Sequence, residues 1–155
     1  MEKAIVIFYG PKVKGFVKFS QKKGENTVVH IKLTGLGKNK KRAIHVHTYG
    51  DMRDGCKSLG GHWNPTNKNH GSFLNGKNHH YGDMINNIVS NLKGEVNLKY
   101  KDPLLKLTGK NHIFGRSVVI HSGIDDLGLG QNKESLITGN AGSRLACGVI
   151  VRYKN

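Results

Sequence analysis

The clearest strand of this chain is Ala43-Ile-His-Val-His-Thr-Tyr49. Apolar and polar residues alternate along it, and this period of two is typical of a β-strand, whose successive side chains point to opposite faces. His45 and His47 are two positions apart, so a strand places both imidazoles on one face, roughly 7 Å apart. The segment therefore predicts a strand that carries two possible metal ligands.

Seven further short strands are expected on either side of it. Each is alternating or β-branched and is bounded by glycine, proline or asparagine. They are Ala4–Tyr9, Val13–Phe19 (with a bulge expected at Gly15), Thr27–Thr34, Met84–Val89, Glu95–Tyr100, Ser117–His121 and Cys147–Tyr153. Eight short strands without a helical period predict an all-β fold, namely an eight-stranded Greek-key β-sandwich or barrel with immunoglobulin-like architecture. No repeat or linker divides the chain, so residues 1–155 are expected to form a single domain.

Two long loops interrupt this pattern. The first runs from Gly50 to about Gly82, and the second, Ser122–Arg144, holds one expected helical turn in Asn132–Thr138. Loops of this length in a small domain are uncommon and usually serve a function. A metal or a disulfide is therefore expected to order them.

The first loop supplies His62, His70, His80 and Asp83. Three imidazoles and one carboxylate form a closed tetrahedral set, which is the pattern of structural zinc. The free energy of binding such an ion also stabilises the segment that provides the ligands. A zinc site would therefore account for the order expected of this loop.

A second set of ligands consists of nitrogen atoms only. His121 ends a predicted strand, and together with His45, His47 and His62 it gives four imidazoles, which suit Cu(II) in tetragonal geometry. An imidazole has two ring nitrogens, so His62 can belong to both sets at once. His30, His79 and His112 fit neither set.

Charge and composition restrict the partners. The chain has 25 Lys and Arg against 10 Asp and Glu, a formal net charge of +15, which predicts an anionic partner or substrate. The cations are spread along the chain, apart from Lys38–Arg42, and aromatic residues are few, so a nucleic-acid partner is disfavoured. No apolar run is long enough for a membrane helix, and no signal peptide is seen, so an intracellular protein without a membrane partner is expected. In a reducing compartment Cys56 and Cys147 would by default be free thiols.

Four segments resemble the copper/zinc superoxide dismutases. They are Ala43-Ile-His-Val-His-Thr-Tyr-Gly-Asp51, Gly61-His-Trp-Asn-Pro65, His80-Tyr-Gly-Asp83 and Gly139-Asn-Ala-Gly-Ser-Arg-Leu-Ala-Cys-Gly-Val-Ile150. The resemblance extends from about residue 4 to residue 151 and is closest to the eukaryotic cytosolic type. The resemblance implies one copper and one zinc ion per chain, with the two ligand sets above and His62 as the bridge.

The same resemblance implies further roles. Asp125 would accept hydrogen bonds from one copper histidine and one zinc histidine. Arg144 would bind the substrate anion, and Thr138 would narrow the channel that leads to the copper. Cys56 and Cys147 would form a disulfide even in the cytosol, which replaces the default of free thiols.

The activity implied is the dismutation of superoxide to dioxygen and hydrogen peroxide by a cytoplasmic homodimer, and a copper chaperone is a candidate partner. The dimer contact would involve Tyr49–Met52, Ile113–Gly115 and the C-terminus, where Arg152 departs from the apolar family pattern. Two departures fall in the second loop: Lys133 replaces an acidic residue, and Ile137 replaces a lysine that steers the substrate. With a net charge of +15 we expect attraction of superoxide to survive both changes.

Two other functions share some of these sequence features. A non-enzymatic relative that delivers or sequesters copper would typically lack a copper histidine, the zinc carboxylate or the arginine, and this chain has all of them. A nucleic-acid-binding protein would use the net charge, but that charge lies on no recognisable nucleic-acid motif. The sequence therefore favours the enzyme.

Overall fold

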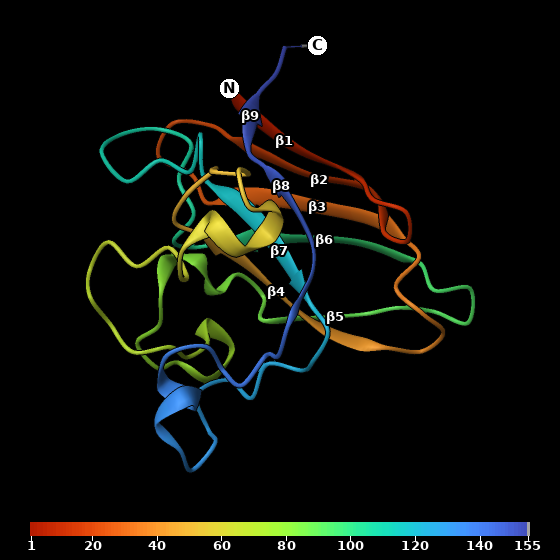
Figure 1. Ribbon diagram of the computed structural model, residues 1–155. Coiled ribbons are helices and arrows are strands. Elements are labelled where there is room, and N and C mark those ends of the chain that lie inside the picture. The colour runs from red at the N-terminus through yellow and green to blue at the C-terminus, as the bar shows by residue number, and fades with distance from the viewer. Residues whose placement is uncertain (155) are drawn as a thin grey trace.

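The computed structural model describes residues 1–154, in which nine strands form two antiparallel sheets (Figure 1). The five-stranded sheet has the order β6-β3-β2-β1-β9, and the four-stranded sheet has the order β5-β4-β7-β8. The strands are β1 (Glu2–Tyr9), β2 (Lys14–Gln21), β3 (Thr27–Thr34), β4 (Lys41–His47), β5 (Asn87–Val89), β6 (Val96–Asp102), β7 (Ser117–His121), β8 (Arg144–Val149) and β9 (Val151–Arg152). Four short 3-10 helices lie in the loops: η1 (Gly55–Leu59), η2 (Phe73–Asn75), η3 (Tyr81–Asp83) and η4 (Lys133–Leu136).

The order of the strands confirms the all-β fold that the alternating pattern predicted. After β3 the chain crosses to lay down β4 and β5 in the second sheet, and β6 then returns to pair with β3. This long return is the Greek-key connection. Alternate residues of β2 and β3, such as Phe19 and Ile31, are fully buried and pack in the core between the two sheets.

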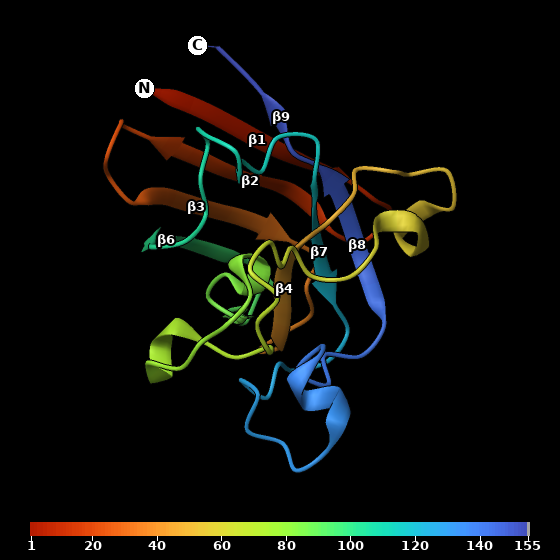
Figure 2. The ribbon, with the colours of Figure 1, turned by 90° about the vertical axis from the view of Figure 1, so that its left-hand side faces the viewer.

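The four-stranded sheet is buried on both faces where it carries ligands. All five residues of β7 are buried, as are the last five residues of β4. On β4, Ile44 and Val46 belong to the core. His45 and His47 alternate with them along the strand, so they point to the opposite face, toward the loops. Figure 2 shows the second long loop, with η4, beyond the ends of β4 and β7, and the later part of the first loop, with η2 and η3, close to β4. The ligand pair therefore lies beneath the loops rather than in water.

The ends of the sheet differ from the prediction. The expected strand Cys147–Tyr153 is two strands, since β8 pairs with β7 in one sheet and β9 pairs with β1 in the other. Ile150 separates them, and its N–H donates to Arg116 O. The chain therefore has nine strands rather than eight because its last segment passes from one sheet to the other.

Two smaller predictions were wrong. The bulge expected at Gly15 is absent: β1, β2 and β3 pair through it without a shift in register. Gly15 has φ of 124°, and a Cβ there would collide with the backbone carbonyl of Lys32, so the glycine permits a close approach of β3. The segment Met84–Asn86 is not strand, because Met84 and Asn86 both have positive φ.

The helical turn expected in Asn132–Thr138 is present as η4.

Within residues 1–154 no helix is both long enough and apolar enough to cross a membrane.

Candidate metal centre

The first ligand cluster joins three parts of the chain. His45 and His47 come from β4, His121 ends β7, and His62 follows η1 and forms an isolated β-bridge with His47. One ring nitrogen from each of the four residues lies within 4.8 Å of the others, and all four residues are buried. The structure thus brings together every residue predicted for copper.

The hydrogen bonds show which nitrogen atoms are available. His47 Nδ1 lies 2.8 Å from Gly60 O, and His121 Nδ1 lies 3.3 Å from Gly142 O. A carbonyl only accepts, so each Nδ1 carries the hydrogen of a neutral ring, and each Nε2 presents a lone pair. These two Nε2 atoms lie 3.3 Å apart. Two lone pairs facing each other repel, whereas a cation between them is stabilised by both.

The other two members of this cluster have unpartnered nitrogens. His45 Nδ1 and His62 Nε2 are buried and have no hydrogen-bond partner among the described residues. A buried polar atom without a partner costs free energy unless it binds something. With the two facing Nε2 atoms these give four nitrogen donors, a set that fits a copper ion.

Burial keeps these rings neutral. It lowers the pKa of His121 to about 4 and also lowers the pKa of His45 and His47, and protonated rings this close to His62 would repel one another, which lowers these pKa values further. A neutral imidazole is the form that ligates a metal. The environment thus prepares these nitrogens for a cation without protonating them.

The second ligand cluster is formed by the first loop. Asp83, at the end of η3, has its Oδ1 2.9 Å from His62 Nδ1, 2.9 Å from His70 Nδ1 and 3.1 Å from His80 Nδ1. Its Oδ2 accepts from the backbone N–H groups of Gly71 and His80. The three Nδ1 atoms and the carboxylate therefore converge on one point, and this donor set fits zinc.

Charge in this second cluster is balanced by the histidines. Burial alone would raise the pKa of Asp83, but hydrogen bonds from the three imidazoles hold it far below the ordinary value. His70 has a carboxylate at each ring nitrogen, and although burial opposes its charge, these contacts raise its pKa to about 9. The cluster thus favours positive charge beside Asp83, and a divalent cation could take the place of the imidazole protons that supply it here.

Asp125 connects the two clusters. Its Oδ2 lies 2.6 Å from His45 Nε2, and its Oδ1 lies 2.7 Å from His70 Nε2. Burial opposes its ionisation, but bonds from these two histidines lower its pKa. An ionised Asp125 requires a hydrogen on each Nε2, so the lone pair of His45 Nδ1 faces the first cluster, and that of His70 Nδ1 would face the second once a metal ion displaces the Nδ1 proton. This is the position that the resemblance implied for Asp125.

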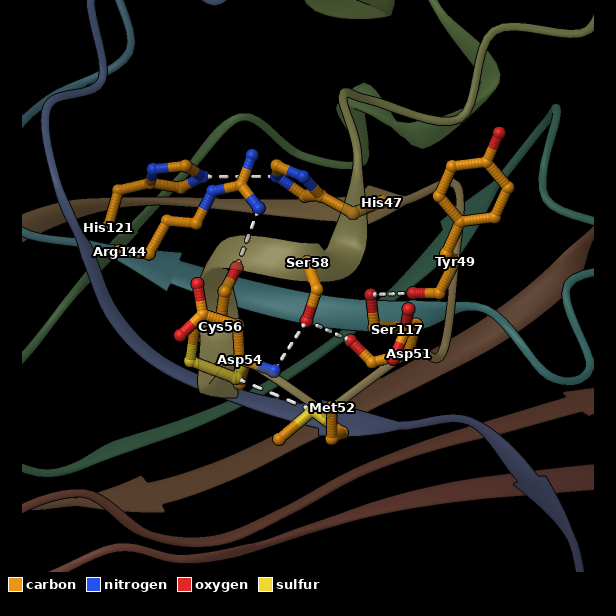
Figure 3. Close-up of a disulfide and its surroundings, with 11 residues drawn as sticks. His47, Tyr49, Asp51, Met52, Asp54, Cys56, Ser58, Ser117, His121 and Arg144 are labelled. Atoms are coloured by element: carbon orange, nitrogen blue, oxygen red, sulfur yellow. Dashed lines mark hydrogen bonds between the residues drawn. A yellow bond between two sulfur atoms is a disulfide. The ribbon is translucent and has the colours of Figure 1, made fainter.

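The disulfide and Arg144 lie next to the copper histidines His47 and His121 (Figure 3). Cys56 and Cys147 are bonded, which confirms the disulfide implied by the resemblance, and the bridge joins η1 to β8. Arg144 Nη1 donates to Cys56 O at 2.7 Å, and Nη2 donates to Gly60 O at 2.6 Å. Gly60 O also faces His47 Nδ1, so one carbonyl orients both a ligand and the guanidinium.

A channel leads from the surface to the first cluster. It is lined by three of the copper histidines, His47, His62 and His121, and also by Glu134, Thr138 and Arg144. Thr138 Oγ1 donates to Glu134 Oε1 at 2.8 Å, which fixes the threonine against η4. A small anion that entered would meet a guanidinium beside neutral imidazoles.

Sequence reasoning missed several supporting residues. Asn86 is fully buried, and its side-chain amide donates to Gly71 O and Asp125 Oδ2. The guanidinium of Arg116 stacks on the Trp63 ring, with its carbon 3.1 Å from the ring centroid, next to the bridging His62. Asn tolerates positive φ, and this was the one local signal for Asn86. The pairing of Trp63 with Arg116 joins distant segments and left no signal in the pattern.

Comparisons with known proteins agree with this geometry. Residues 13–150 match the family model described as copper/zinc superoxide dismutase (SODC). Curated relatives named "Superoxide dismutase [Cu-Zn]" from Podospora anserina and from Saccharomyces cerevisiae are each 45% identical over 152 residues, which is 97% of this chain and 97% of the relative. A crystal structure titled as that of the clock protein EA4 aligns with a TM-score of 0.91 at 36% identity, and covers 97% of this chain and 94% of the other.

Proposed function

The chain belongs to the copper/zinc superoxide dismutase family, and we propose specific roles in that activity for the residues described above. The protein is an enzyme, an oxidoreductase whose cofactors are copper and zinc. When bound, copper supplies the reversible one-electron chemistry that turns two superoxide anions and two protons into dioxygen and hydrogen peroxide, while zinc supplies a fixed positive charge.

We assign copper to His45, His47, His62 and His121, and zinc to His62, His70, His80 and Asp83. The observation that carries this assignment is the position of His62. Its Nε2 faces the first cluster and has no hydrogen-bond partner among the described residues, and its Nδ1 lies 2.9 Å from Asp83 Oδ1 in the second cluster. One ring would therefore contribute a ligand nitrogen to each of the two ions.

His62 is also the proposed proton carrier. It lines the channel, and its Nδ1 is held by the second cluster, so a proton exchanged by this residue would reside on Nε2. Each turnover consumes two protons; one is supplied from Nε2 and the other from solvent. Asp83 and Asp125 keep the neighbouring rings in the tautomers that leave this nitrogen free.

Arg144 is the proposed binding group for superoxide. A guanidinium is permanently charged and presents several donors to a small anion. Two of its arms are fixed by Cys56 O and Gly60 O, so the charge stays at the channel without further ordering of the side chain. Thr138, which comes from the second loop and lines the same channel, is the residue proposed to limit its width.

The test is metal analysis combined with a dismutation assay. Wild-type protein should contain one copper and one zinc per chain and should be active, whereas His62→Ala should lose activity and bind less of both metals. His30→Ala is the matched control, because His30 lies on the five-stranded sheet and contacts Asn97 instead of a ligand. Full activity of wild type without copper, or of His62→Ala, would contradict the assignment.

A homodimer belongs to the same proposal. Tyr49, Met52 and Val151 expose apolar surface near the contact implied by the resemblance. Arg152, the departure in that region, is 3.4 Å from Glu2 and lies over the Phe114 ring at 4.5 Å, so its charge is partnered within its own chain. Asn155 lies outside the described residues. Sedimentation at micromolar concentration should give a dimer, and a monomer would refute this part.

The single domain over residues 1–155, the cytoplasmic location and copper delivery by a chaperone are proposals that rest on the resemblance. The domain is supported by one core shared between the two sheets. Cell fractionation would test the location. Copper content of the protein produced with and without a candidate chaperone would test delivery.

A further inference from the structure

We propose that Lys57 and Ser143 form an outer binding site for small monoanions, from which superoxide passes to Arg144. The inference rests on the proposed role of Arg144. It names a cation in the disulfide loop as the group that collects the substrate, a role that the family pattern gives to a lysine at the position of Ile137.

The backbone of Lys57 is fixed beside Arg144. Lys57 lies in η1 between Cys56, whose sulfur is bonded to Cys147 and whose carbonyl accepts from Arg144, and Ser58, whose hydroxyl donates to Asp51 O at 2.6 Å. The N–H of Lys57 donates to Asp54 O at 3.0 Å. Its position relative to the guanidinium is therefore set by the disulfide and these short hydrogen bonds, while its side chain is exposed.

Two adjoining hollows share the wall formed by Gly142 and Arg144. The inner hollow is the channel that ends at the copper histidines, and the outer hollow is lined by Lys57, Ser143, Cys56 and Asp54. An anion in the outer hollow thus has Arg144 between itself and the metal centre.

The cations around these hollows are few. Among the described residues, Lys57 and Arg144 are the only lysine or arginine that line either one. Lys133 and the apolar Ile137 are exposed on or next to η4, and of these two only Ile137 lines the channel. In the described part of the chain no carboxylate comes within ion-pair distance of the Lys57 ammonium, so its charge is available to a ligand.

Five of the other lysines lie on strands of the five-stranded sheet. Lys14, Lys18, Lys32, Lys99 and Lys101 lie on β2, β3 and β6, and Figure 2 shows these strands in the sheet that does not carry the loops. Charges separated by more than about 8 Å of water are largely screened at physiological salt. A cation at the rim therefore has a much greater effect on encounter than the net charge of +15.

Asp54 places a negative charge in the proposed anion site. Asp54 lines the same outer hollow as Lys57 and Arg144, so its negative charge opposes the field of these two cations. Removing the lysine should weaken the capture of superoxide, and removing the aspartate should strengthen it. Damage to the fold would lower the rate of capture in both variants. Opposite changes in the two variants would therefore show that the local electric field is responsible.

The experiment uses the metal-loaded enzyme and measures the second-order rate constant with superoxide at ionic strengths from about 0.01 M to about 0.3 M. At low ionic strength Lys57→Gln should lower the constant about 3-fold, Lys57→Glu about 10-fold, and Asp54→Asn should raise it about 2-fold. Lys99→Gln is the matched control, since it removes the same charge from β6 and should equal wild type. The differences should disappear at high ionic strength.

A second readout does not depend on turnover. Azide, a small monoanion, is titrated into the Cu(II) protein and its Kd is read from the absorption of the copper-bound anion. Lys57→Gln should raise this Kd about 3-fold at low ionic strength, and Lys99→Gln should leave it unchanged. Equal Kd values and equal rate constants for Lys57→Gln and wild type would overturn the outer site. An inactive wild type would instead overturn the proposed function, and the azide titration would still decide about Lys57.

Discussion

The five-stranded sheet and the loops over the four-stranded sheet are ordered in different ways. In the sheet, β1, β2 and β3 pair in continuous register and bury one apolar side chain in every two residues. The loops have little regular structure apart from short 3-10 helices. They are held by a few polar groups, of which Asp83, Asp125 and the disulfide each join segments far apart in the chain.

The difference separates two ways of offsetting conformational entropy. A strand residue adds its own buried area and its own ladder bonds, so the order of the sheet is spread over many small contributions. A loop of thirty residues gains order from a small number of cross-links, and each of these can be removed by chemistry. The loops should therefore be selectively sensitive to metal, to reduction and to single polar substitutions.

Removing both metals with a chelator should have the largest effect. Binding of structural zinc can contribute on the order of 10 kcal/mol, and residues 50–83 and 122–144 provide or support most of the ligands. Hydrogen exchange in these two loops should accelerate at least 100-fold, while β2 and β3 keep most of their protection. Mass spectrometry of peptides from each region measures this directly.

Re-adding zinc and copper is the control, and it should restore protection in the loops first. An equal loss of protection in β3 and in residues 50–83 would show that sheet and loops form one cooperative unit. That result would contradict the idea that the sheet and the loops are stabilised separately.

Removing the disulfide is the next largest change. Cys56 and Cys147 are 91 positions apart, so their bond limits the unfolded chain and contributes about 4 kcal/mol in the chain-entropy model. The double substitution Cys56→Ser with Cys147→Ser should lower the free energy of unfolding by that amount, measured in denaturant. It should also lower activity, because the Cys56 carbonyl that holds Arg144 is no longer tied to β8.

Reduced wild type should behave like the double variant. If the double variant lost stability but kept full activity, Arg144 would be held sufficiently by Gly60 alone.

The same difference explains what the sequence could predict. The range of β3, Thr27–Thr34, and that of β7, Ser117–His121, were predicted at their observed limits, since the period of two is a local signal. The division of the last strand at Ile150 was not predicted, because it depends on which sheet edge lies beside each half of the segment.

In the candidate site, too, some residues could be predicted from the sequence and others could not. His45 and His47 were identifiable from their type and spacing, and the remaining ligands from their type together with the resemblance. The carbonyl of Gly60, which faces both His47 and Arg144, was not predictable, because backbone oxygens are the same at every residue. Asn86 was missed for a related reason, since its amide contacts Asp125 and Gly71 only after the loops have met.

Substitution of Asp125 should have a moderate effect. Asp125→Asn leaves one oxygen to accept, so His45 Nε2 and His70 Nε2 cannot both donate to it. Loss of a carboxylate behind a ligand typically costs 10- to 100-fold in metal affinity, and competition with a chelator would measure this for zinc and copper separately (about 10- to 100-fold weaker for each).

Asp126→Asn is the matched control. It makes the same change of charge one residue further along the same loop, where Asp126 contacts Ser135 and Asn140 but no histidine. Equal losses of metal affinity in the two variants would mean that the charge of the loop, rather than the two hydrogen bonds, is responsible.

The smallest effect should come from trimming the sheet core. Ile31 is fully buried in β3, and Ile31→Val removes one methylene, which costs about 1 kcal/mol. Ile31 pairs with Val17 and Leu98, and it contributes no group to either cluster, so the loss should be the same in metal-loaded and metal-free protein. The free energy of unfolding of both proteins in both states gives the coupling between sheet and loops. A coupling near zero means that the two regions are stabilised independently, whereas a loss that doubles when metal is removed means that the loops also hold the sheet together.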